Sequence, residues 1–128
     1  ARNRLADLFL DTLTVNAHTT ASAALWAGLP VVTKCGQGFA ARVASSLLSA
    51  VGMPELIAAT EDEYEEIALD LATNRKRLTK LRADLASKRS STPLFQSDRF
   101  TRNLERAYDE AHARFLAGGL PGAISICS

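Results

Sequence analysis

Short apolar runs alternate with polar, glycine-containing segments over the first half of the chain. Three of these runs are rich in strand-forming residues and lie between acids, glycines or prolines; they cover residues 7–12, 30–34 and 55–59. Runs of this kind are typical of buried β-strands. The pattern therefore predicts three short strands in this half of the chain.

Helical patterns fill the intervals between these runs. The alanine-rich run 21–27 follows two threonines and stops at Gly28 and Pro30, which favours a helix with a sharp end. We expect its Trp26 to be an anchor in the core. A second helix is expected from Phe39 to about residue 51, and its apolar face would carry Phe39, Val43 and Leu47.

Beyond Thr60 the period of the apolar residues becomes helical, with a break at residues 90–95. Thr60 and Glu63 have the spacing of a capping box, and this predicts a helix that begins directly after Thr60. A further helix is expected over 76–88 and a last one from about Asp98 to Gly118. The apolar stripe of the last helix consists of Phe100, Leu104, Tyr108, Ala111 and Phe115.

Strands that alternate with helices indicate a parallel α/β sheet, because parallel neighbours need a crossover connection. Three short strands are few for the helices around them, so we expect the second half of a larger doubly wound domain. We divide the chain into a partial α/β lobe (1–92), a C-terminal helix packed on it (93–117) and a tail (118–128). The absence of a starting Met also suggests part of a longer protein.

Composition narrows the class further. The chain has 128 residues, 47% of them hydrophobic, and a net charge of +1, which suits one globular domain and gives no basic excess for nucleic acid. No run is long enough for a membrane span. Cys35 and Cys127 lie far apart without further ligands at metal spacing, so we expect no zinc site and a reducing compartment.

Candidate chemistry lies between the first predicted strand and the first predicted helix. In open α/β sheets, ligands bind beyond the carboxyl ends of strands, where helix N-termini offer free backbone N–H groups to phosphate. His18, Thr19 and Thr20 occupy this position and add an imidazole and two hydroxyls. The alternative is a simple threonine N-cap. The loop Gly36-Gln37-Gly38 is a weaker candidate, since such a pair of glycines usually marks a tight turn.

An ordered set of segments resembles the C-terminal catalytic region of the O-linked N-acetylglucosamine transferases, the family that includes the SPINDLY-like proteins. The matching segments are 7–12, 16–20, 24–33, 39–48, 55–58 and 91–95. The resemblance implies the second half of the Rossmann-like C-terminal lobe of a GT-B glycosyltransferase, in which His18, Thr19 and Thr20 bind the UDP diphosphate. The family's catalytic lysine and acceptor-side residues would precede residue 1, so no catalytic residue is expected in this chain, which alone would be inactive.

The resemblance also implies what the whole protein does. The donor would be UDP-N-acetylglucosamine and the acceptor a protein Ser or Thr hydroxyl, with no metal or other cofactor, no nucleic acid and no membrane partner. A cytoplasmic location follows, with the nucleus as well in a eukaryote. One departure stands out: the family usually has a ribose-binding Asp five residues after the motif His, where this chain has Ala23. The alternative is therefore a degenerate, non-catalytic lobe that serves as a protein-interaction module.

Overall fold

The computed structural model describes residues 2–126, which divide into two compact units, one ending at Phe95 and the other beginning at Gln96. The strands are β1 (Phe9–Leu10), β2 (Val31–Lys34) and β3 (Ile57–Ala58). The α-helices are α1 (Thr19–Trp26), α2 (Val43–Ala50), α3 (Glu61–Thr73), α4 (Arg75–Lys88) and α5 (Ser97–Leu116). The 3-10 helices are η1 (Arg2–Leu5), η2 (Phe39–Ala41), η3 (Pro54–Leu56) and η4 (Pro93–Phe95).

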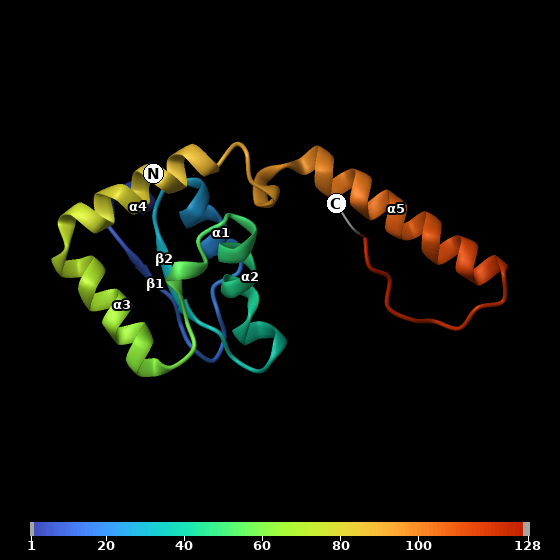
Figure 1. The fold of residues 1–128 in the computed structure, drawn as a ribbon, viewed down its shortest axis with the longest axis horizontal. Helices are drawn as coiled ribbons and strands as arrows, with labels where there is room; N and C mark the ends of the chain where they lie inside the picture. The colour runs from blue at the N-terminus through green and yellow to red at the C-terminus, as the bar shows by residue number, and fades with distance from the viewer. Residues whose placement is uncertain (1, 127–128) are drawn as a thin grey trace. The chain divides into compact units, whose positions relative to one another are not determined.

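The first unit is built on a parallel sheet of three strands in the order β1-β2-β3. Phe9 pairs with Val31, and Thr33 pairs with Ile57. Figure 1 shows α3 on one side of the strands and α1 and α2 on the other. The central strand β2 is therefore covered on both faces, which explains why its first three residues, Val31 to Thr33, are all buried. The predicted short parallel sheet with flanking helices is confirmed.

The core joins the sheet to helices on both of its faces. Val31, Val32 and Thr33 of β2 are fully buried, and the other large, fully buried side chains are Leu25, Pro30, Leu48, Val51, Met53, Leu56, Leu71 and Leu85. Burial of a large aliphatic side chain contributes about 1.5–3 kcal/mol. Because these residues come from β2, from α1 to α4 and from the connections between them, one core holds the whole first unit together.

Helix α2 differs from its predicted form. The expected helix from Phe39 is split into the 3-10 helix η2 and α2, with Arg42 between them. Phe39 is 76% exposed, so its expected place on an apolar core face is wrong. The buried residues of α2 are Ala44, Ser45 and Leu48, and Leu47 of the predicted apolar face packs partly buried against the core.

Trp26 is likewise not a core residue, because 54% of its surface is exposed. Its ring meets Phe95 edge to face with centroids 5.0 Å apart, and the Arg89 guanidinium lies 4.8 Å from the ring centroid. Arg89 also donates a hydrogen bond to the Trp26 carbonyl at 2.9 Å. Trp26 therefore fastens the end of α1 to the segment after α4 at the surface of the unit.

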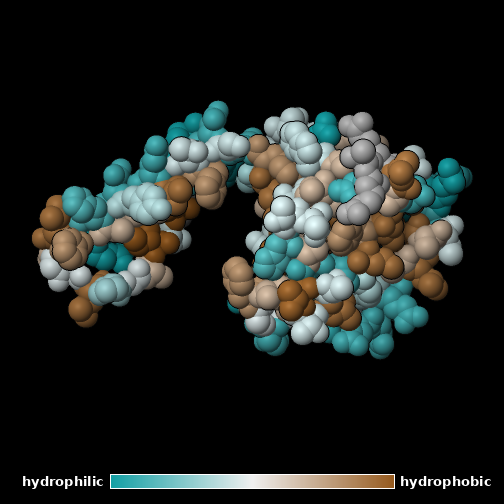
Figure 2. Space-filling view, turned by 180° about the vertical axis from the view of Figure 1, so that it is seen from behind, coloured by the Kyte–Doolittle hydropathy of each residue, from teal (hydrophilic) through white to brown (hydrophobic). Residues whose placement is uncertain are grey.

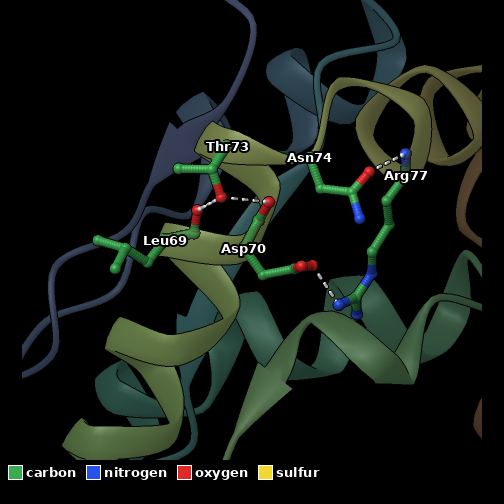
Figure 3. Close-up of polar contacts among 5 residues, drawn as sticks. All are labelled: Leu69, Asp70, Thr73, Asn74 and Arg77. Carbon is green, nitrogen blue, oxygen red and sulfur yellow. Dashed lines mark hydrogen bonds and ion pairs between the residues drawn. The ribbon is translucent and has the colours of Figure 1, made fainter.

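Polar contacts form the corner between α3 and α4 (Figure 3). At the end of α3, the Thr73 hydroxyl donates to the carbonyl of Leu69 at 2.8 Å. At the start of α4, Asn74 caps the helix by accepting from the Arg77 N–H at 3.1 Å, and the Arg77 guanidinium pairs with Asp70. The Asn74 cap satisfies an N–H at the start of α4 that would otherwise lack a partner.

The second unit consists of α5 and the segment that follows it. The predicted apolar stripe is present on α5. Within this unit, the side chains of Phe100, Tyr108 and Phe115 are 67%, 67% and 76% exposed. Figure 2 shows hydrophobic side chains gathered along one side of this unit and hydrophilic ones along the other. Packing of this helix on the lobe remains a prediction.

Candidate functional site

Two loops follow the carboxyl ends of neighbouring parallel strands, at the edge where open α/β folds bind ligands. Residues 11–18 connect β1 to α1, and residues 35–38 connect β2 to η2. The first loop contacts η2 directly after the second loop, since the backbone N–H of Asn16 donates to the carbonyl of Ala40 at 2.9 Å. Both loops therefore lie side by side at the sheet edge where a ligand site is predicted.

His18, Thr19 and Thr20 lie together at the start of α1, and all three are exposed. The helix begins at Thr19, with His18 at the N-cap position and no side-chain capping bond. A simple threonine N-cap, the alternative to a ligand site, is therefore not formed. The first backbone N–H groups of a helix have no partner within the helix, so those of Thr19 and Thr20 point outward with two hydroxyls beside them. This arrangement can bind an anion such as a phosphate.

Ala23 lies on the same face of α1 as Thr19, because residues four apart on a helix are neighbours. It is exposed, and its methyl group offers no hydrogen bond. Side chains on a helix lean toward the N-terminus, so a longer polar residue at this position would point toward Thr19. The geometry is thus suited to the ribose contact that the resemblance implies, and the sequence lacks the group that would make it.

A buried carboxylate lies directly beneath the loop that leads to α1. Asp11 is only 5% exposed. One of its oxygens accepts from the backbone N–H of Ala17 at 2.7 Å, and the other accepts from the hydroxyl of Thr33 at 2.7 Å. A buried charge is tolerated only when it is paired or hydrogen-bonded, and both carboxylate oxygens meet this condition.

Two further side chains attach this loop to the helices around it. Asn16, which is 3% exposed, donates to the Thr12 carbonyl at 2.9 Å and accepts from the Ala44 N–H of α2 at 3.3 Å. The Tyr64 hydroxyl of α3 donates to the Asp11 carbonyl at 3.0 Å. Burial, with a smaller contribution from the nearby Asp11 charge, raises the pKa of Tyr64 above its usual value.

Sequence reasoning missed the role of this polar group. The sequence pattern marks Asp11 only as the polar boundary of a strand and Thr33 only as a strand former. The available signal was a carboxylate directly after a buried strand, followed five residues later by Asn16 and opposite a lone hydroxyl in an apolar strand. Nothing local in the sequence pairs Asp11 with Thr33, since they lie 22 positions apart.

The second loop is a tight turn. A side chain at Gly36 would put its Cβ 2.5 Å from the Cβ of Ala41, and the Gly36 N–H donates to the Ala41 carbonyl at 2.8 Å. These contacts explain Gly36 without a phosphate. Beyond the turn, the Phe39 ring stands edge to face with the imidazole of His18, with centroids 6.2 Å apart. The loop therefore borders the start of α1 with an exposed aromatic ring.

Other features of the unit lie apart from this edge. A cavity of about 690 Å³ opens between Asp7, Leu71 and Arg82, at the amino end of β1 and therefore away from the edge where ligands are expected. Among residues 2–126, no cluster of three or more His, Cys, Asp and Glu could hold a metal. Cys35 is a free, exposed thiol, and Cys127 lies outside the described residues. No helix in the described range is long and apolar enough to cross a bilayer.

Known proteins similar to this chain include several peptide N-acetylglucosaminyltransferases. The probable UDP-N-acetylglucosamine–peptide N-acetylglucosaminyltransferase SEC of Arabidopsis thaliana is 44% identical over 108 residues, which cover 84% of this chain and 11% of that protein. A UDP-N-acetylglucosamine–peptide N-acetylglucosaminyltransferase of Caenorhabditis elegans is 39% identical over 117 residues, covering 91% and 10%. The chain thus spans about a tenth of the length of these relatives.

A solved structure gives the same result for the fold. A mutant O-GlcNAc transferase of Thermobaculum terrenum superposes with a TM-score of 0.73 at 43% identity, covering 80% of this chain and 20% of that one. The predicted identity of the fold, part of a GT-B glycosyltransferase, is confirmed by this neighbour. The family described as glycosyl transferase family 41 matches residues 1–104. The chain therefore belongs to glycosyl transferase family 41.

Proposed function

We propose that this chain is the UDP-diphosphate-binding part of an enzyme that transfers N-acetylglucosamine from UDP-N-acetylglucosamine to Ser and Thr hydroxyls of proteins. The observation that carries the proposal is the uncapped, exposed start of α1 in a chain of this family. There His18, Thr19 and Thr20 lie at the carboxyl edge of the sheet. The named activity of the relatives supports the donor and the acceptor.

The chemistry assigned to these residues is stabilisation of the leaving group. In the transfer, the acceptor oxygen attacks the anomeric carbon and loses its proton, while the bond from that carbon to the diphosphate breaks with inversion. Negative charge grows on the departing UDP. The N–H groups and hydroxyls of Thr19 and Thr20, with the His18 imidazole, bind that charge before the bond breaks, and fixed donors of this kind stabilise a transition state without reorganising. The residues that activate the acceptor lie outside this chain.

Charge neutralisation by a helix end requires no metal ion. The diphosphate would meet backbone donors, hydroxyls and the positive end of the helix dipole instead of a divalent cation. We accordingly propose a metal-independent transfer, which takes place in the cytoplasm, and in the nucleus as well in a eukaryote.

The test is sugar transfer by the full-length protein that contains these residues. It is incubated with UDP-N-acetylglucosamine and a Ser/Thr peptide in the presence of a chelator, and the mass of the peptide and the released UDP are measured. We expect the peptide to gain one N-acetylglucosamine and the Thr19→Val/Thr20→Val variant to lose most of the activity. Thr79→Val, an exposed threonine on α4, is the matched control and should stay active. Absence of transfer by the wild-type protein would contradict the proposal.

Ala23 favours one alternative, a lobe that no longer binds nucleotide and acts in protein interaction. The methyl group cannot bond the ribose, and the surrounding face of α1 is exposed and available to a protein partner. This alternative predicts no saturable heat when UDP is titrated into the full-length protein. The enzyme proposal predicts saturable binding under the same conditions.

A further inference from the structure

We propose that Asp11 and Thr33 are positioning residues, which hold the loop 11–18 in the conformation that aims the start of α1 at the diphosphate. The inference rests on the proposed function, since it names what keeps the proposed UDP site in place. It concerns residues that do not touch the nucleotide themselves.

The first step is the attachment of the loop at its two ends. At the β1 end, the Asp11 N–H donates to the Val32 carbonyl at 3.0 Å and continues the ladder of the sheet. At the α1 end, the Asp11 carboxylate accepts from the N–H of Ala17, the residue directly before His18, at 2.7 Å. Asp11 thus links the last hydrogen bond of β1 to the residue that precedes the N-cap of α1.

The second step is the anchor of the carboxylate itself. Its other oxygen accepts from the Thr33 hydroxyl at 2.7 Å, and Thr33 is a fully buried residue of the central strand β2. The side chain of Asp11 is therefore held between the central strand of the sheet and the backbone that leads into α1. Hydrogen bonds to a charged group are stronger than those between neutral groups, which makes this a stiff connection.

The third step concerns the rest of the loop, which is fastened from two other directions. Asn16 ties it to α2 through the Ala44 N–H, and Tyr64 of α3 bonds the Asp11 carbonyl. All of these contacts converge on the seven residues that precede His18. A buried polar network that is fully satisfied specifies one conformation and rigidifies its surroundings.

Stability alone does not require this network. Buried charged or polar groups can often be replaced by apolar side chains of similar volume at little cost to folding, whereas removal of one partner is costly. An apolar residue at position 11 would fill the same space, but it could not hold the Ala17 N–H in a fixed direction. The two donors of Thr19 and Thr20 follow within three residues of that bond, so their aim depends on it.

The test is calorimetric titration of UDP into the full-length protein and its Thr33→Val variant. Valine keeps the volume of threonine and removes the one hydroxyl that anchors Asp11. We expect the Kd for UDP to rise about fivefold or more, since a buried acceptor loses its donor beneath the site. Thr33→Ser restores the hydroxyl and should bind UDP nearly as the wild type does.

A matched control separates positioning from general stability. Leu81→Ala creates a cavity on α4, and its melting temperature can be compared with that of Thr33→Val. We expect Leu81→Ala to lower the melting temperature without raising the Kd. Equal Kd values for Thr33→Val and the wild type would overturn the inference, and so would an equal loss of affinity in Leu81→Ala.

Two further outcomes are informative. If Thr33→Val does not fold, Tyr64→Phe replaces it, because it removes only the hydroxyl that bonds the Asp11 carbonyl. A rise in Kd of about twofold to tenfold is then expected, and an unchanged Kd refutes the inference. If the wild-type protein itself shows no saturable binding of UDP, the proposed function fails and this inference falls with it.

Discussion

The substitution Ala23→Asp would add the one polar group that the start of α1 lacks. Ala23 is exposed and lies about 6 Å further along the helix axis than Thr19, on the same face. An aspartate there leans toward the helix start, beside the place where the ribose of a UDP bound at Thr19 and Thr20 would lie. We expect the variant to bind UDP more tightly than the wild type.

The magnitude follows from two opposing terms. A hydrogen bond between a charged group and a ribose hydroxyl contributes about 1.5–3 kcal/mol. The new carboxylate also repels the diphosphate, and at a separation of about 8 Å in water this costs about 0.5 kcal/mol per unit charge before screening by salt. The lower helix propensity of aspartate affects free and bound protein equally and does not enter the Kd. For the two to three charges of the diphosphate, salt screening over a Debye length of about 8 Å leaves about 0.5 kcal/mol of repulsion in total. The net gain of about 1–2.5 kcal/mol corresponds to a Kd about fivefold to seventyfold lower.

The assay compares UDP with its 2′,3′-dideoxyribose analogue in calorimetric titrations of the full-length protein. The gain should appear with UDP and vanish with the analogue, which has no hydroxyl for the carboxylate to bond. Ser22→Asp is the matched control, because it adds the same charge one position earlier and therefore on another face of α1. This control should weaken UDP binding slightly through repulsion.

Two results would refute this reasoning. An Ala23→Asp variant that binds UDP no better than the wild type would show that the ribose does not lie above this face of α1. An equal gain for UDP and the dideoxy analogue would show that the carboxylate acts through something other than the ribose.

Three further predictions concern the protein without ligand. In a chain that carries Tyr108→Phe, Tyr64 is the one remaining tyrosine, and its ultraviolet absorbance should report half-ionisation above pH 10.0, because burial and then the Asp11 charge raise the pKa of Tyr64. The contribution of the neutral Tyr64 side chain to folding stability is complete below pH 10.0 and is lost as the pH rises through the pKa of Tyr64 in the folded state. Half-ionisation of Tyr64 at or below pH 10.0 would contradict its burial. Gly28→Ala should lower the free energy of unfolding by about 1–2 kcal/mol in urea titration, because φ is +80° there while no atom lies within 4 Å of a new Cβ. An unchanged urea midpoint for Gly28→Ala would rule out backbone strain at this position. Thr60→Ala should cost about 1 kcal/mol in thermal melts by loss of the helix cap, and Thr60→Ser should recover most of it.

The elements with strong local signals could be predicted from the sequence. The cap at Thr60, which accepts from the Glu63 N–H at 3.1 Å, begins α3 where the capping-box spacing placed it. The strands at 7–12, 30–34 and 55–59 are present in shorter form, since only the paired part of each apolar run becomes strand. Local chemistry at caps, breakers and apolar runs decides these features, so the sequence displays them.

Features that depend on tertiary contacts could not be predicted in this way. Phe39 and Trp26 are large and apolar, yet both are exposed, because a 3-10 turn and the end of a short helix direct them outward. The position of His18, Thr19 and Thr20 at a helix start was predictable from the threonines and the alanine run after them. The buried bond from Thr33 to Asp11 was not, since it joins two strands whose pairing no local pattern specifies.

The most direct test of the central claim is calorimetric titration of UDP into the full-length protein and its Thr19→Val/Thr20→Val variant. Both threonines lie at the exposed start of α1, and valine keeps their shape while it removes both hydroxyls. The account predicts saturable binding by the wild type and a Kd about tenfold or more higher for the variant, since two hydrogen bonds to a charged diphosphate are lost. Absence of saturable heat in the wild type, or equal affinity in the variant, would contradict a UDP site at the start of α1.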